Sequence, residues 1–260
     1  MSGRAVRRVS VPTETTAPGG ATNAYLVEAD AGTILVDPAG RIDALDAAVA
    51  EGSVDHVLVT HAHPDHVGGV AAYAAETGAT VWARRGREAR FEAATGVAPD
   101  RTFAEGERVA GATVLDTPGH APDHVVIETP DGILAGDLVR ATGSVAVAAP
   151  KGDVRAYLVA LRRLLARDPP RLYPGHGPVV DDPRATIRRL YDHRLDRERR
   201  IERAVREGAA SVDAVLDAAY DRDLSGVRSL AAATVRAHLD KLALEGRIRI
   251  DAETGRLDPA

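Results

Sequence analysis

The stretch Thr60-His61-Ala62-His63-Pro64-Asp65-His66-Val67-Gly68-Gly69 places three histidines and one aspartate within six residues, directly after an apolar run. Alternate residues of an extended segment point to the same side, so His61 and His63 are expected to converge on one point. Pro64 suits the first turn of a helix, which predicts a helix that runs on through Tyr73. A strand end that leads into such a loop and helix would hold imidazoles and a carboxylate rigidly, as a metal site requires.

Further candidate ligands follow at the ends of later predicted strands. Gly119-His120, Gly136-Asp137 and Gly175-His176 each come after a short apolar run. With the first stretch they give seven candidate metal ligands: His61, His63, Asp65, His66, His120, Asp137 and His176. Seven ligands are too many for one tetrahedral zinc ion and suit two ions that share a carboxylate. We therefore expect two divalent metal ions, with zinc favoured by the imidazole and carboxylate set and iron or manganese as alternatives.

The remaining pattern is that of a mixed chain with short strands. Apolar runs bounded by Gly and Pro predict strands over residues 6–11, 24–27, 33–36, 57–60, 80–83, 113–116, 125–128, 133–135 and 171–173. The runs at 125–128 and 133–135 are expected to pair as a hairpin. Helical spacing of apolar residues predicts helices over residues 42–50 and 154–167.

The composition narrows the class of protein. At 260 residues, 45% hydrophobic and 27% charged, the chain suits one large globular domain, or a domain of about 200 residues with a small appendage. The absence of cysteine removes disulfides, thiolate ligands and a cysteine nucleophile, and is compatible with the cytoplasmic location that we expect. The net charge of −5 gives no global attraction to nucleic acid or to an anionic membrane. No apolar run approaches the ~18 residues of a membrane span, so we expect no membrane partner.

The motif His61-x-His63-x-Asp65-His66 and the later matches, which cover residues 20–180, resemble the metallo-β-lactamase fold superfamily of αββα metallohydrolases. The resemblance implies an α+β fold class with an αββα sandwich. It implies that His61, His63 and His120 hold one metal, that Asp65, His66 and His176 hold the other, and that Asp137 bridges them. The chain departs from the flavodiiron branch, which has an acidic residue at the position of His63.

The character of the chain changes after Pro183. Helices are expected over residues 184–206, 211–220 and 226–245, followed by a small hairpin from 247, which is the pattern of a winged helix-turn-helix. We expect a metallo-β-lactamase-like catalytic domain over residues 1–195 and a winged-helix-like domain over residues 196–260. Six basic residues balance six acidic ones between Ser211 and Ile250, which argues against a DNA-binding regulator. The tail would instead flank the active-site mouth or form a homodimer.

The tail narrows the resemblance to one subgroup. Tyr173-Pro174-Gly175-His176-Gly177-Pro178, Ala121-Pro122-Asp123-His124 and the C-terminal helices are similar to β-lactamase-like proteins that carry a small winged-helix-like tail. That subgroup includes an endoribonuclease that acts on single-stranded RNA. His124 has two roles open to it: it could protonate a leaving group as a catalytic residue, or support the site as a buried strand residue.

These observations predict a binuclear metal-dependent hydrolase that uses a metal-bridging hydroxide, with Asp65 as both a ligand and the residue that orients the hydroxide. The leading substrate is single-stranded RNA, from the subgroup resemblance. One alternative is a hydrolase of small-molecule thioesters or esters, of the hydroxyacylglutathione hydrolase type. A second is a mononuclear iron persulfide dioxygenase, which has the same histidine loop and uses fewer ligands.

Overall fold

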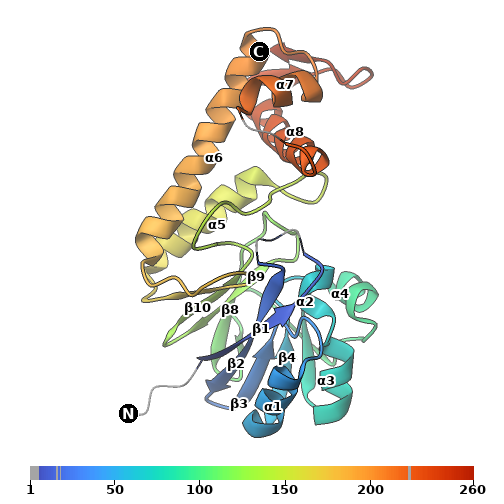
Figure 1. Cartoon of the computed structure of the whole chain (residues 1–260), viewed down its shortest axis with the longest axis vertical. Helices are drawn as coiled ribbons and strands as arrows, with labels where there is room; N and C mark the ends of the chain where they lie inside the picture. Colours follow the sequence, from blue (N-terminus) through green and yellow to red (C-terminus); the bar gives the residue numbers. More distant parts are fainter. Residues whose placement is uncertain (1–5, 16, 18, 222–223) are drawn as a thin grey trace.

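Two β-sheets lie face to face in the first 180 residues of the chain (Figure 1). The computed structural model describes residues 6–15, 17, 19–221 and 224–260. The first sheet has the order β1 (Val6–Pro12), β2 (Ala21–Ala29), β3 (Gly32–Val36), β4 (Val54–Leu58), β5 (Thr80–Arg84) and β6 (Arg101–Phe103). The second has the order β11 (Leu172–Pro174), β10 (Gly132–Gly136), β9 (Val125–Thr129), β8 (Ala112–Asp116) and β7 (Arg108–Val109).

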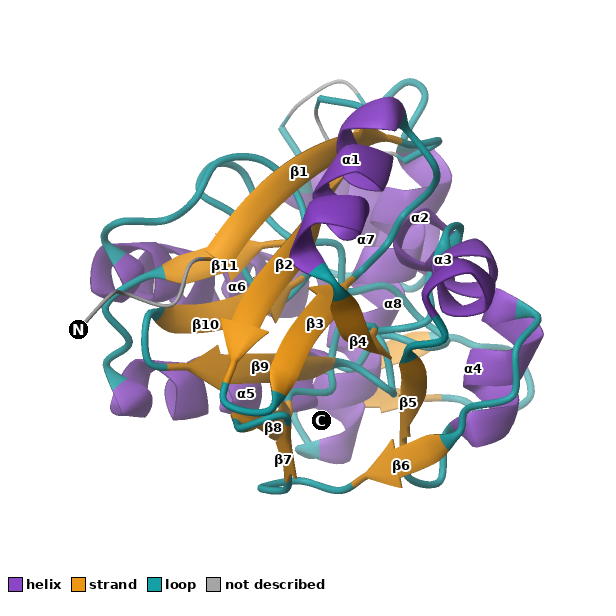
Figure 2. Cartoon of the chain, turned by 90° about the horizontal axis from the view of Figure 1, so that it is seen from below, coloured by secondary structure: helices purple, strands orange, loops and turns teal. Residues whose placement is uncertain are grey.

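Helices cover the outer face of each sheet, so the layers run helix, sheet, sheet, helix (Figure 2). On the first sheet they are α1 (Asp43–Gly52), α3 (Val70–Thr77) and α4 (Glu88–Thr95), and on the second they are α5 (Val154–Arg167) and the start of α6 (Pro183–Arg206). α5 shows why these helices dock, because Leu158, Leu161 and Leu164 recur on its buried face. The predicted αββα sandwich is therefore what the chain forms before the tail.

The space between the two sheets is filled by aliphatic and tyrosine side chains. Val27, Ile34 and Val36 from the first sheet meet Ile127 and Leu134 from the second, and all five are buried. This apolar filling explains how a chain with only 3% aromatic residues builds its core, since β-branched and leucine side chains interlock well on pleated surfaces.

The predicted helix from Pro64 through Tyr73 is wrong as a single helix. The structure has α2 (Pro64–Val67) and α3, which are separated by Gly68 and Gly69. The Gly69 amide donates to the Pro38 carbonyl at 2.7 Å, and a Cβ at Gly68 would lie 2.5 Å from the Ala39 carbonyl oxygen. The backbone of the turn after β3 thus lies so close to Gly68 and Gly69 that the helix is interrupted at these two residues. A side chain at Gly68 would clash with that turn, so only glycine fits.

The region between β5 and β8 holds more structure than the sequence indicates. Residues 85–111 look like a polar, arginine-rich excursion, yet they form α4, β6 and β7. Each of these elements has a single buried residue. It is Phe91 in α4, Phe103 in β6 and Val109 in β7. Such short elements lack the repeated apolar spacing by which a pattern is recognised.

The tail follows without a break in the backbone helix. α6 packs on the second sheet through Ile187 and Leu190, and then continues into the tail, where Ile201 and Val205 lie in a separate core. α7 (Val212–Ala219), α8 (Arg228–Leu244) and the hairpin of β12 (Ile248–Ile250) with β13 (Leu257–Pro259) complete that core. The expected boundary near residue 195 falls inside α6 and stays a prediction. Among the described helices, none combines the length and the apolarity that crossing a membrane requires.

Candidate metal centre

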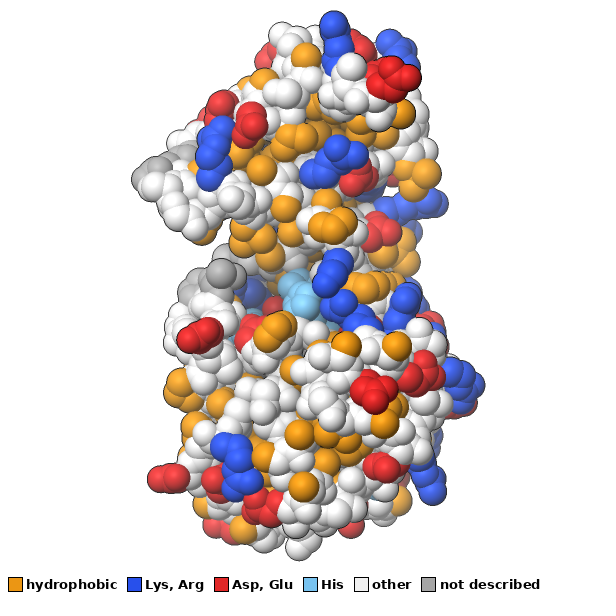
Figure 3. All heavy atoms as spheres, turned by 90° about the vertical axis from the view of Figure 1, so that its right-hand side faces the viewer, with side chains coloured by type: hydrophobic (Ala, Val, Ile, Leu, Met, Phe, Trp, Pro, Cys, Tyr) orange, Lys and Arg blue, Asp and Glu red, His pale blue; other side chains and the backbone are white. Residues whose placement is uncertain are grey.

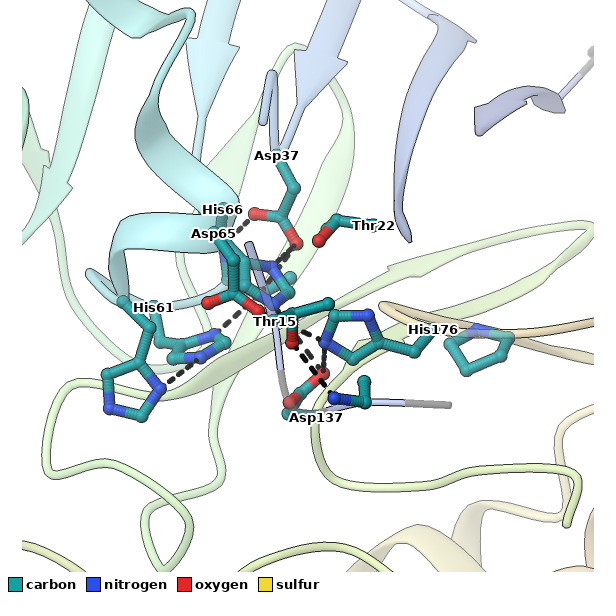
Figure 4. Close-up of polar contacts among 12 residues, drawn as sticks. Thr15, Thr22, Asp37, His61, Asp65, His66, Asp137 and His176 are labelled. Atoms are coloured by element: carbon teal, nitrogen blue, oxygen red, sulfur yellow. Dashed lines mark hydrogen bonds and ion pairs between the residues drawn. The ribbon is translucent and has the colours of Figure 1, made fainter. Parts of the chain in front are cut away.

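The seven predicted ligands come from four separate chain segments, and the fold brings them all to one edge of the sandwich. The loop after β4 supplies His61, His63, Asp65 and His66, while the segments after β8, β10 and β11 supply His120, Asp137 and His176. Figure 4 shows Asp65, His66, Asp137 and His176 pointing toward one another. The side chains form three overlapping groups in which the potential ligand atoms lie within 4.8 Å of one another.

Three imidazole nitrogens converge on one side of this cluster. His63 Nδ1 lies 2.9 Å from His61 Nε2 and 2.9 Å from His120 Nε2. The other nitrogen of His120, Nδ1, faces the Ala146 carbonyl at 2.6 Å and must donate to it, so in the neutral ring the lone pair is on Nε2. The Thr60 hydroxyl donates to Asp37 and therefore accepts from His61 Nδ1, which leaves His61 Nε2 as a second lone pair. A metal ion bound among the three nitrogens would accept a lone pair from each of them, as in a three-histidine metal site.

The other side of the cluster is richer in carboxylates. His176 Nε2 lies 3.5 Å from Asp65 Oδ2 and 3.4 Å from Asp137 Oδ1. His66 Nε2 lies 3.6 Å from Asp137 Oδ1, and both atoms are buried without a hydrogen-bond partner among the described residues. A cation is the natural partner for such atoms, because a buried polar group without one is costly.

Asp137 lies between the two sides. Its Oδ1 faces His66 and His176, whereas its Oδ2 lies 3.6 Å from His120 Nε2. A Cβ on Gly175 would lie 2.6 Å from Asp137 Oδ1, so the glycine keeps this space open. The residues present therefore fit two ions that share one carboxylate.

Asp37 organises the site from behind, and the sequence pattern does not single it out. Its buried carboxylate accepts from the Thr60 amide at 2.6 Å, from the Thr60 hydroxyl at 2.7 Å and from His66 Nδ1 at 2.9 Å. These bonds fix the ring orientation of His66 and leave its Nε2 facing Asp137. The available signal is an aspartate at the end of a buried strand, which by itself indicates only a residue that stops that strand.

Two other residues hold the ligand loops. Asp123 accepts from the Ala62 amide at 2.8 Å and from Arg90, which fixes the loop between His61 and His63. Asn23 donates to the Pro174 carbonyl at 2.9 Å and to the Gly177 carbonyl at 2.8 Å, on either side of His176. Both contacts join segments that lie far apart in the sequence.

His124 is buried, and both of its ring nitrogens are engaged. Nε2 accepts from the Asp137 amide at 3.0 Å, and Nδ1 lies 2.9 Å from the Thr117 hydroxyl. Burial, together with the neighbouring histidines, lowers the pKa of His124 to about 3, so the ring is neutral at physiological pH. These contacts hold the Asp137 main chain in place, and a catalytic role for His124 stays a prediction.

The two sides of the cluster differ in their electrostatics. Burial and the neighbouring imidazoles lower the pKa of His63 to about 4, so its ring is neutral at physiological pH, as metal binding requires. Burial would also lower the pKa of His66, but the Asp37 carboxylate outweighs it and raises the value to about 9. Metal binding at His66 must therefore displace a proton, and the affinity of that side should rise with pH.

The fold and this cluster define an αββα protein with a candidate metal centre. The chain belongs to the metallo-beta-lactamase superfamily, whose family model matches residues 17–176. The Beta-lactamase-like protein 2 homolog of Drosophila melanogaster is 30% identical over 254 residues, which cover 88% of this chain and 84% of that protein. An Atrochrysone carboxyl ACP thioesterase of Aspergillus chevalieri is 34% identical, over 73% of this chain and 63% of that protein.

A solved structure shares the architecture of the whole chain, including the tail. A metallo-beta-lactamase family protein from Thermus thermophilus superposes with a TM-score of 0.78 and covers 98% of both chains, at 24% identity. At that identity the likeness shows the fold alone.

Proposed function

We propose that the protein is a binuclear metal-dependent hydrolase that cleaves phosphodiester bonds of single-stranded RNA. The observation that supports two ions is the position of Asp137, whose two carboxylate oxygens face two different sets of imidazoles. The subgroup resemblance of the tail and of the His176 segment supports RNA as the substrate. The order of three helices and a hairpin favours a winged-helix-like tail, and a cytoplasmic location stays an expectation from the cysteine-free composition.

The residues of the cluster have three kinds of role: they would hold the ions, orient the nucleophile and keep the ligands in place. His61, His63 and His120 would hold one ion and Asp65, His66 and His176 the other, with Asp137 shared. When bound, the two ions supply a hydroxide nucleophile at neutral pH and stabilise the negative charge that develops on the substrate. The Asp65 side chain is 17% exposed and points into the cluster, where it would orient the hydroxide as well as bind metal (Figure 4). Asp37 and His124 keep the rings and the bridging carboxylate in place.

Thioester hydrolysis is the second candidate. It is favoured by the Aspergillus relative that is named as a thioesterase. The same cluster would serve either reaction, since both need an activated water and a stabilised oxyanion. The difference must lie in how the mouth of the site holds the rest of the substrate.

A substrate panel tests the proposal. The purified protein, loaded in turn with zinc, iron or manganese, is offered single-stranded RNA, duplex RNA, acyl-glutathione and acyl-coenzyme A. We expect cleavage of single-stranded RNA and a much lower rate on both thioesters. The variant His61→Ala, prepared identically, should lose the activity and so excludes a contaminating nuclease. Efficient thioester turnover with intact RNA would contradict the proposal.

A further inference from the structure

A groove of about 470 Å³ lies directly beside the metal centre, between the sandwich and the tail. Pro118, Gly119 and Pro122, which flank His120, form the wall nearest to the metal cluster. The other walls come from the start of α5 and from α8. Figure 3 shows a histidine in the hollow at the waist of the molecule, with Lys and Arg side chains next to it.

Backbone hydrogen bonds connect the walls of the groove. The Asp153 amide donates to the Gly119 carbonyl at 2.8 Å, which attaches the start of α5 to the His120 loop. The Ala149 amide donates to the Ala233 carbonyl at 3.0 Å, which attaches the segment before α5 to the tail. These two bonds connect the groove walls to the loop that carries His120 and to the tail.

Three cations on this groove lack counter-charges. Arg87, Lys151 and Arg155 line it and are exposed, and their side chains form no hydrogen bond or ion pair with any residue in the described part of the chain. Neighbouring arginines behave differently: Arg84 binds Asp116 at 2.6 Å, and Arg90 binds Asp123 at 2.8 Å. Three cations without a counter-charge therefore lie together on the walls of this groove.

The other charged groups of the groove do not cancel these three. Lys241 is bound by Glu198 and Glu245, and Asp240 is bound by Arg236. Asp153 is the remaining carboxylate, and it accepts from the Ala156 amide as the cap of α5. The groove therefore has a local excess of positive charge on a chain whose net charge is −5, which attracts an anion to this place and not to the whole surface.

We propose that this groove binds the phosphates of the RNA strand next to the scissile bond, through Arg87, Lys151 and Arg155. The inference rests on the proposed function and names how that substrate is held. The volume is that of a site for a drug-sized ligand, so a short segment of single strand fits and a duplex does not. Phosphates held here, beside the His120 loop, would place the next phosphodiester over the metal cluster.

The test compares two triple variants that remove the same charge. The groove variant is Arg87→Gln, Lys151→Gln, Arg155→Gln. The matched control is Arg162→Gln, Arg188→Gln, Arg203→Gln, three exposed arginines that do not line the groove. Each is assayed on a short single-stranded RNA, between about 50 and about 200 mM salt, and on bis-(p-nitrophenyl) phosphate.

In the groove variant, KM for RNA should rise at least about tenfold at low salt. The slope of log kcat/KM against log salt should become shallower by about 2, because each phosphate contact on a single strand contributes about 0.7. The control should keep the wild-type slope, and turnover of the small phosphodiester should change less than about threefold in both. Equal slopes in the two triple variants, or an equal loss on the small phosphodiester, would overturn the proposal.

A measurement of RNA binding distinguishes a failure of the groove inference from a failure of the proposed function. Fluorescence anisotropy with the same labelled RNA measures the groove without any cleavage. If the wild-type protein binds RNA and the groove variant loses that binding, the groove inference stands even if no RNA is cleaved, and only the proposed function fails. If both proteins bind RNA equally, or if the groove variant loses only the binding of acyl-coenzyme A, the groove inference is wrong.

Discussion

Replacing Asp137 with alanine is expected to lower turnover at least about 10³-fold, which corresponds to about 4 kcal/mol of transition-state stabilisation. Its Oδ1 lies 3.4 Å from His176 Nε2, and its Oδ2 lies 3.6 Å from His120 Nε2. Without this carboxylate the two sides of the cluster share no ligand, so at least one ion should be lost or misplaced. Folding should persist, because the Asp137 amide still donates to His124 and the carboxylate fills no part of the apolar core.

Turnover and metal content of the purified variant are measured together with its melting temperature. Asp181→Ala is the matched control, since Asp181 lies after the last ligand segment and its side chain is 77% exposed. That control should behave as the wild type does. An Asp137→Ala variant with unchanged turnover would show that the bridge has been assigned to the wrong residue.

Replacing Glu198 with alanine is expected to lower the free energy of unfolding by about 3 to 5 kcal/mol. The Glu198 side chain is 4% exposed and binds Lys241 Nζ at 2.9 Å and an Arg247 terminal nitrogen at 2.8 Å. Removing it leaves the Lys241 ammonium, itself only 9% exposed, without its buried partner. Because Lys241 belongs to α8, the loss should loosen the wall that the tail contributes to the groove.

Denaturant unfolding at several pH values checks this result. Burial raises the pKa of Glu198, but its bonds to His238 and Lys241 outweigh burial and lower the value from 4.5 to about 2. A carboxyl with a lowered folded-state pKa stabilises the fold above its unfolded pKa, and this contribution is lost as the pH falls from about 4.5 toward 2. The difference between wild type and variant should shrink over that range.

Asp196→Ala is the control on the same helix. Asp196 pairs with Arg199 at the surface and is 53% exposed, so its loss should cost less than about 1 kcal/mol. Equal destabilisation by the two substitutions would show that Glu198 contributes no more than a surface ion pair.

The candidate ligand set could be predicted from the sequence because each candidate ligand stands next to a local signal. His61, His63, Asp65 and His66 share one loop, and His120, Asp137 and His176 each follow a glycine at the end of a strand. The structure brings all seven together. The residues that hold them carry no such local signal, because Asp37 bonds to Thr60, 23 residues away, and Asn23 bonds to the Pro174 carbonyl, 151 residues away. Only the folded chain brings such partners together.

The break between α2 and α3 and the charge of the groove also depend on contacts that the sequence pattern does not reveal. In the sequence, Gly68 and Gly69 are two glycines within a helical pattern. Only the fold shows that the backbone of the turn after β3 lies against them. The chain has 33 Lys and Arg residues. Nothing in the sequence next to Arg87, Lys151 or Arg155 indicates that these three lack a counter-charge. The net charge of −5 gives no global attraction to nucleic acid, whereas the placement of these three side chains indicates a local one at the mouth of the site.

Metal analysis of crystals grown with excess zinc tests the central claim most directly. Anomalous diffraction should show two ions per chain, about 3.5 to 4 Å apart, with Asp137 bound to both. One ion should lie among His61, His63 and His120, and the other among Asp65, His66 and His176. A single ion, with Asp65 and His66 turned away from it, would contradict the binuclear account.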